Sequence, residues 1–99
     1  MNTLQLVTIV KAKVENRDLV KQEILKLIPT IRKEKGCQYY NFFEDSKDNS
    51  RFILKESWAN KDDLQAHIKS PHLANYTEAT KGAVEIWDII ELTPIDEVN

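Results

Sequence analysis

The chain has 99 residues, of which 41% are apolar and 30% are charged, and this length supports one hydrophobic core rather than two. We therefore expect a single domain over residues 1–99. Fourteen lysines and arginines against sixteen aspartates and glutamates give a formal net charge of −2, so the basic excess typical of nucleic-acid-binding proteins is missing. Neither a signal peptide nor an apolar stretch of membrane-spanning length is evident, and we expect a cytoplasmic protein that binds neither nucleic acid nor membrane.

The chain begins with a predicted strand and a long helix. Residues 4–14 are β-branched and apolar, which predicts a strand. Residues 17–35 carry apolar side chains at helical spacing, with Asn16 as the expected N-cap and Gly36 as the residue that ends the helix. The expected buried stripe of this helix consists of Val20, Ile24, Leu27, Ile28 and Ile31.

Two aromatic-rich strands are predicted next, over residues 38–44 and 51–58. The polar segment 45–50 between them is rich in turn-forming residues, so the two strands should form an antiparallel hairpin around a six-residue turn.

Two short helices follow the hairpin. Asn60 and Asp63 have the spacing of a capping box, and Ser70-Pro71 supplies the cap and first residue of the second of these helices. A last apolar strand is predicted over residues 84–92.

The order strand, helix, strand, strand, helix pair, strand is the βαββαβ pattern of a ferredoxin-like α+β sandwich. Right-handed crossovers would place every helix on the same face of the sheet. The strands are nevertheless apolar on both faces, so the helix-free face needs a cover. We therefore expect a two-fold symmetric homodimer through the open sheet face.

The sequence offers few groups for holding a cofactor. Its single cysteine, Cys37, excludes an intrachain disulfide and a multi-cysteine zinc site, and we expect a buried, inert thiol. Its two glycines, Gly36 and Gly82, are too few for a glycine-rich dinucleotide turn or phosphate loop. No cofactor is expected.

Glu56 is the first candidate for chemistry. Strand alternation places it on one face with Leu54 and Trp58, so burial of that face would desolvate the carboxylate and raise its pKa toward that of a general base. The alternative is a structural carboxylate that pairs with a lysine or accepts hydrogen bonds from Trp58 or a tyrosine.

The two histidines are the next candidates. His67 lies on the inner face of the second helix, and His72 is the second residue of the third, where the helix dipole favours a neutral imidazole. Each could accept a proton or serve as a hydrogen-bonded packing group. A metal site is not expected, because five residues of helix separate two side chains by about 140°, Pro71 breaks the helix, and no carboxylate cluster is nearby.

Large aromatic side chains could line a hollow between the sheet and the short helices, where a flat aromatic ligand would stack. The alternative is an ordinary core, since strands and helix faces need large residues in any case. The residues concerned are Tyr40, Phe42, Trp58, Tyr76 and Trp87.

Three segments, 34–40, 51–58 and 64–72, resemble the antibiotic biosynthesis monooxygenase domain family. They carry a Gly-Cys pair before a tyrosine-containing strand, an Arg-Phe-x-x-x-Glu-x-Trp strand and a His-x-x-Ser-Pro-His junction. The resemblance extends over nearly all of residues 4–94. It implies a dimeric ferredoxin-like α+β barrel that oxidises phenols or quinols with dioxygen and without a cofactor.

Within that resemblance, His67 or His72 is the expected base and Glu56 its helper. The expected substrate-binding residues are Trp58, Tyr40, Tyr76 and Asn75.

Family membership alone leaves the reaction open. Haem-degrading relatives carry an iron-ligating histidine and a tryptophan where this chain has Thr77 and His67, which argues against haem degradation. Other relatives isomerise a phosphorylated signalling sugar, and a non-catalytic dimeric ligand-binding module is a third alternative.

Overall fold

The computed structural model describes residues 3–96, so residues 1–2 and 97–99 of the expected domain lie outside it. Four strands form one antiparallel sheet in the order β2-β3-β1-β4. Their bounds are β1 (Leu4–Ala12), β2 (Cys37–Asp45), β3 (Asp48–Trp58) and β4 (Val84–Leu92). The helices are α1 (Arg17–Arg32), α2 (Lys61–Ile68) and α3 (Pro71–Ala79).

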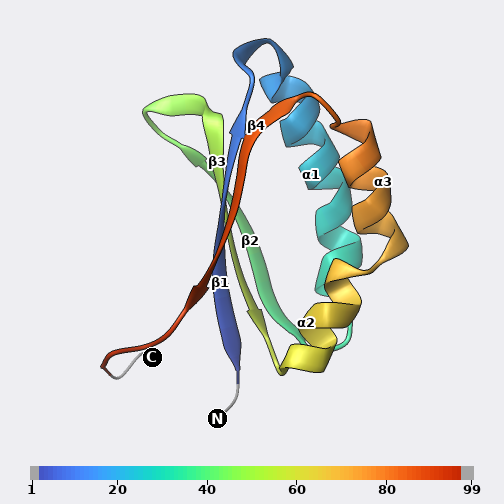
Figure 1. Cartoon of the computed structure of the whole chain (residues 1–99), viewed down its shortest axis with the longest axis vertical. Coiled ribbons are helices and arrows are strands. Elements are labelled where there is room, and N and C mark those ends of the chain that lie inside the picture. The colour runs from blue at the N-terminus through green and yellow to red at the C-terminus, as the bar shows by residue number, and fades with distance from the viewer. Residues whose placement is uncertain (1–2, 97–99) are drawn as a thin grey trace.

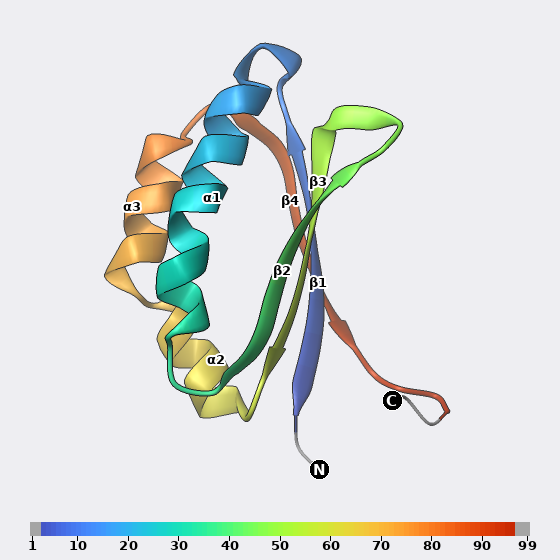
Figure 2. The ribbon, with the colours of Figure 1, turned by 180° about the vertical axis from the view of Figure 1, so that it is seen from behind.

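All three helices lie on the same face of the sheet (Figure 1, and from behind in Figure 2). The expected ferredoxin-like α+β fold is therefore confirmed. None of the helices within residues 3–96 is long and apolar enough to cross a membrane.

The core lies between the sheet and α1. Burial alternates along β1, where Leu6 and Val10 face the helices, and the five predicted apolar positions of α1 are all buried. The same alternation buries Phe52, Leu54 and Trp58 on β3, as their pattern predicted. Each such side chain contributes about 1.5–3 kcal/mol to folding through its removal from water.

The entry to α1 differs from the prediction. β1 ends at Ala12, and a short 3-10 turn, Val14–Asn16, precedes the helix. The Asn16 side chain accepts no hydrogen bond from the first turn, so the expected N-cap is wrong. The 3-10 turn leads directly into the helix, and Asn16 has φ −113° and ψ 8° rather than the extended backbone of most N-caps.

The hairpin turn is also shorter than predicted, because β2 runs to Asp45 and β3 begins at Asp48. Asp45 accepts a hydrogen bond from the Lys47 backbone N–H, and Asp48 accepts one from Ser50. The side chains of these aspartates stabilise a connection of two residues. The other residues of the predicted six-residue turn therefore belong to the two strands.

Both short helices begin at the predicted caps. The Asn60 side chain accepts a hydrogen bond from the Asp63 N–H at 2.8 Å, and the Ser70 hydroxyl accepts one from Leu73 at 3.4 Å. Gly36 follows α1 with φ +83°, and a Cβ there would overlap the Asp63 carboxylate. The left-handed backbone predicted for Gly36 is confirmed, but α1 already ends at Arg32, so the glycine shapes the turn that follows the helix and lets β2 start close beneath α2.

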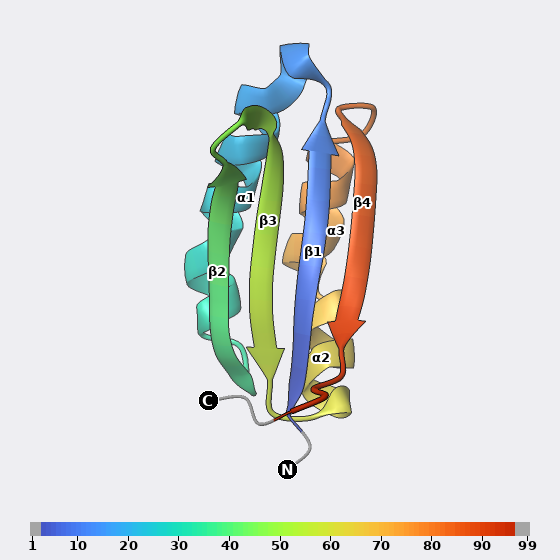
Figure 3. The same ribbon diagram turned by 90° about the vertical axis from the view of Figure 1, so that its left-hand side faces the viewer.

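Within residues 3–96, no helix covers the opposite face of the sheet (Figure 3). β1 and β3 present half-buried apolar side chains there, and the outer strands β2 and β4 present exposed ones. The exposed large side chains of this open face are Tyr39, Phe43, Ile86, Ile90 and Leu92. The apolar second face predicted from the strand pattern is therefore present and uncovered within one chain.

Candidate functional site

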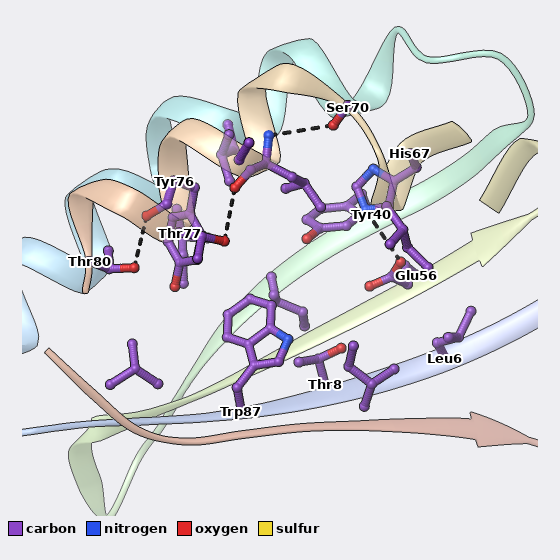
Figure 4. Close-up of a pocket in the computed structure, with 18 of the residues that line it drawn as sticks. Leu6, Thr8, Tyr40, Glu56, His67, Ser70, Tyr76, Thr77, Thr80 and Trp87 are labelled. Atoms are coloured by element: carbon purple, nitrogen blue, oxygen red, sulfur yellow. Dashed lines mark hydrogen bonds and ion pairs between the residues drawn. The ribbon is translucent and has the colours of Figure 1, made fainter. Parts of the chain in front are cut away.

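A cavity of about 710 Å³ lies between the helix-covered face of the sheet and the short helices (Figure 4). All four strands contribute residues to one wall, and α1, α2 and α3 contribute the other. Most of the lining is aliphatic or aromatic, including Leu6, Leu27, Leu54, Leu73, Trp87 and Ile89. Such a cavity suits a flat apolar ligand that is held by a few polar groups.

The polar groups at one end of the cavity are Tyr40, Glu56 and His67, which face one another in Figure 4. They come from β2, β3 and α2 respectively. Strand pairing places Tyr40 opposite Glu56, and the N-cap at Asn60 sets the phase that turns His67 inward. Three separate elements thus meet at this end.

The orientation of His67 is set by Glu34, which lies just beyond α1. His67 Nδ1 is 2.8 Å from Glu34 Oε1 and its side chain is almost fully buried. Because the Glu34 carboxylate can only accept a hydrogen bond, we assign the proton of the neutral His67 ring to Nδ1. His67 Nε2 then carries the lone pair, 4.0 Å from Glu56 Oε1.

Glu56 is 5% exposed, and its only donor among residues 3–96 is Trp58, whose Nε1 donates to Glu56 Oε1 at 2.8 Å. Burial raises the pKa of the Glu56 carboxyl, while the Trp58 hydrogen bond and the nearby His67 oppose that rise. No lysine pairs with it in the described chain. The hydrogen bond expected from Trp58 and the expected desolvation are therefore both present.

Two buried tyrosines supply hydroxyl donors. Burial, followed by the charge of Glu56, raises the pKa of Tyr40 far above its usual range, and burial raises the pKa of Tyr76 to about 12. Both phenols stay protonated near neutral pH. Tyr76 Oη has no hydrogen-bond partner within residues 3–96, and its ring packs on Trp87 with centroids 5.5 Å apart. It is a buried hydroxyl at the cavity wall.

The candidate residues fall into three places. Glu56, His67, Tyr40 and Tyr76 line the cavity. Trp58 lies behind it, fully buried, with its ring 4.5 Å from the His67 ring.

His72 and Asn75 line a separate hollow of about 300 Å³, together with residues of α1. α3 starts anew at Pro71, so the helical phase of α2 does not extend to His72.

The expectation that the two histidines point about 140° apart on one helix is wrong, because they lie on two different helices. His72 Nε2 lies 3.4 Å from Glu34 Oε1, so both imidazoles face one carboxylate. The expectation that no clustered carboxylates are nearby did not consider Glu34, a single carboxylate that is 33 positions from His67 in the chain but lies beside both histidines.

Glu34 was missed as a site residue. A signal for it exists: it is the one acidic residue in the basic run 32–35 at the carboxyl end of α1. The helix dipole disfavours a carboxylate there, so such a residue needs a partner elsewhere in the fold. Cys37, by contrast, is half-buried, and burial followed by Glu34 raises its thiol pKa, in keeping with the expected inert role.

Comparisons with known proteins agree with this architecture. Residues 5–79 match the family model described as antibiotic biosynthesis monooxygenase. The chain is 32% identical over 87 residues to the probable quinol monooxygenase YgiN of Escherichia coli strain K12, an alignment covering 80% of this chain and 84% of that protein.

Solved structures show the same fold. PA3566 from Pseudomonas aeruginosa superposes with a TM-score of 0.91 at 21% identity, over 97% of each chain. Rv0793 from Mycobacterium tuberculosis superposes with a TM-score of 0.88 at 21% identity, over 99% of this chain and 100% of that one. With the family model matching most of its length, the chain belongs to the antibiotic biosynthesis monooxygenase family.

Proposed function

We propose that the protein is a cofactor-independent monooxygenase that oxidises a phenolic or quinol-type small aromatic with dioxygen. The observation that carries this is the apolar cavity with His67 Nε2 and Glu56 Oε1 at one end, 4.0 Å apart. The likeness to a relative named a probable quinol monooxygenase supports the same substrate class.

The 4.0 Å gap is too long for a direct hydrogen bond but suits a bridging hydroxyl. A substrate hydroxyl in this gap would donate its proton to His67 Nε2, about 2.8 Å away, and lie beside the Glu56 carboxyl. Glu34 and Glu56 then flank the imidazolium and stabilise it. The Tyr76 hydroxyl is available to a second substrate oxygen deeper in the cavity.

Deprotonation makes the aromatic ring electron-rich enough to pass an electron to dioxygen. Recombination forms a carbon–oxygen bond, one oxygen atom stays on the ring and the other leaves as water. A quinol supplies both electrons and both hydrogens of that water, so quinol plus dioxygen gives hydroxyquinone plus water. The protein has to provide only the base, the hydrogen bonds to the anion and a water-poor cavity.

The proposal includes a homodimer formed through the open face. The exposed apolar side chains there lie next to one another instead of being scattered singly, which is typical of an interaction surface. A two-fold symmetric dimer, in which two copies pair through the same face, is the commonest protein assembly. Trp87 and Ile89 of the edge strand β4 lie on the other, helix-covered face, where they line the cavity and remain 41% and 52% exposed, so the cavity is open at this edge of the sheet.

The test is oxygen uptake with menadiol under metal chelation, with ¹⁸O₂ to follow the oxygen atom. We expect one labelled atom in the product and, in His67→Ala, a rate at least about 100-fold lower. Glu34→Gln should also slow the reaction. Glu44→Gln should not, because Glu44 is an exposed carboxylate of β2 that does not line the cavity. Unchanged oxidation in a His67→Ala, His72→Ala double variant would discard the imidazole base.

The same assay separates the alternative functions. The cationic side chains that line the cavity, Lys69 and Lys81, are both exposed, so its interior favours an apolar aromatic over a phosphorylated sugar. Isomerisation of a phosphosugar without oxygen uptake would point to the isomerase, and tight aromatic binding without turnover to the non-catalytic module.

A further inference from the structure

We propose that Glu34, His67 and His72 form a binding site for a divalent transition-metal ion, of which Zn²⁺ fits best. The ligand atoms Glu34 Oε1, His67 Nδ1 and His72 Nε2 all lie within 4.8 Å of one another. Two imidazoles and one carboxylate form a donor set that zinc accepts in proteins, with a fourth position left for water.

The two spacings to Glu34 are close to those around a tetrahedral ion, while the pair of histidine nitrogens lies within 4.8 Å and has to close where it exceeds the tetrahedral spacing. Zinc bonds of about 2.0–2.2 Å place neighbouring ligand atoms roughly 3.3 Å apart. Glu34 Oε1 lies 2.8 Å from His67 Nδ1 and 3.4 Å from His72 Nε2. The first pair has to open by roughly 0.5 Å to admit the ion, a shift that rotation of the Glu34 side chain can supply.

Two features of the ligands point to a missing cation. His72 Nε2 is buried and has no hydrogen-bond partner within residues 3–96, although a carboxylate is nearby. Glu34 lies just past the carboxyl end of α1, where the helix dipole disfavours its negative charge. A metal ion between them would satisfy the nitrogen and neutralise the carboxylate.

The surroundings also match a metal-binding histidine. A ligating imidazole typically donates its other N–H to a carboxylate, which is itself hydrogen-bonded. With the ion on Nδ1, His67 carries a proton on Nε2, which faces the Glu56 carboxylate across 4.0 Å and has to move closer to donate to it, and Glu56 accepts a hydrogen bond from Trp58.

The hollow between α1 and α3 gives the ion a route that avoids the cavity. His72 lines this hollow and its side chain is 25% exposed, whereas the cavity reaches the cluster only through His67. A bound ion therefore leaves the cavity open but places a proton on His67 Nε2. Zinc would then prevent His67 from accepting a substrate proton and act as an inhibitor of the proposed oxidation.

The test measures binding without substrate, so it does not depend on the proposed activity. The full chain is stripped with a chelator and titrated with Zn²⁺ by calorimetry and with Co²⁺ by visible absorption. We expect one ion per chain, micromolar or tighter affinity, and the intense bands of tetrahedral cobalt. Zn²⁺ should shift the NMR signals of His67 Nδ1 and His72 Nε2, the chain having only these two histidines.

Variants locate the ion. His72→Asn and Glu34→Gln should each weaken Zn²⁺ binding by about 10-fold or more, since one of three protein ligands is lost. Glu23→Gln is the matched control, because its carboxylate lines the same hollow but lies outside the cluster, and its affinity should stay within about twofold of the original.

Three outcomes would overturn the proposal: millimolar affinity in the original chain, unchanged affinity in His72→Asn, or ring-nitrogen signals that zinc does not shift. The NMR measurement decides the matter in the original chain if a variant does not fold. A chain that binds zinc but oxidises no quinol would refute the proposed function and leave the metal site standing.

Discussion

The two faces of the sheet use similar residues to different ends. Leu54 and Ile53 are neighbours on β3, yet Leu54 is 1% exposed beneath the helices, while Ile53 lies half-buried on the open face. The covered face also holds the buried ionisable groups, Glu56 and His67, whereas the open face combines apolar side chains with the exposed charges of Lys55 and Asp88. One face of the chain thus carries a finished core and a site, and the other carries a surface suited to a second copy.

The largest expected effect is on the covered face. Leu54→Ala should lower the free energy of unfolding by about 2–5 kcal/mol, because it removes a fully buried side chain and leaves a cavity. Ile53→Ala on the opposite face should cost less than about 1.5 kcal/mol at low protein concentration and more at high concentration, where the dimer forms. Urea unfolding at two protein concentrations measures both. Equal losses without concentration dependence would contradict the assignment of the faces.

A charge on the open face should dissociate the proposed dimer. Ile90→Lys places an ammonium in an apolar interface, and we expect the dimer dissociation constant to rise by about 100-fold or more while the chain stays folded. Light scattering over a concentration series measures it. Gln22→Lys, on the exposed side of α1, is the control for added charge. A monomeric original chain at micromolar concentration would remove the dimer altogether.

Removing the buried charge of Glu56 should stabilise the fold. The pKa of Glu56 is raised in the folded chain, so the protonated carboxyl contributes favourably to the free energy of unfolding at a pH below its unfolded pKa. That contribution is lost as the pH rises through the folded pKa, where the buried group becomes charged. In the presence of a chelator, Glu56→Gln should remove that loss and gain about 1 kcal/mol at neutral pH while activity falls.

Thermal unfolding against pH checks this prediction, with exposed Glu44→Gln as the control that should change stability by less than about 0.5 kcal/mol. A Glu56→Gln chain that is less stable at neutral pH would show that the carboxylate stabilises the fold.

The smallest effect is expected at the hairpin end of the sheet. Asp48 accepts a hydrogen bond from Lys11 Nζ at 2.7 Å, and this contact, followed by the Ser50 hydrogen bonds, lowers the Asp48 pKa to about 2. The contribution of Asp48 is present above its unfolded pKa and is lost as pH falls from about 4 to about 2. Asp48→Asn should lower the melting temperature by about 2 °C or less at pH 7 and low salt. The same difference at pH 2 would exclude the ion pair as its cause.

Local patterns in the sequence were enough for most of the architecture. Apolar periodicity predicted the four strands and the buried stripe of α1, and the polar caps at Asn60 and Ser70 predicted where α2 and α3 begin. Strand alternation also placed Glu56 inside. These features depend on residues a few positions apart, where backbone sterics and short-range hydrogen bonds act.

The tertiary structure decided what depends on distant residues. The hairpin turn is shorter than local turn propensity predicted, and Asp48 at its end contacts Lys11 of β1, a partner that the local sequence cannot show. Glu34 contacts His67, which is 33 positions away in the chain. Because α3 begins anew at Pro71, His72 lies in the hollow beside α1 instead of the cavity and faces the same carboxylate. Periodicity assigns each side chain to a face of its own element, but the distance between two faces is set only when the elements pack, and the chemistry of this site depends on those distances.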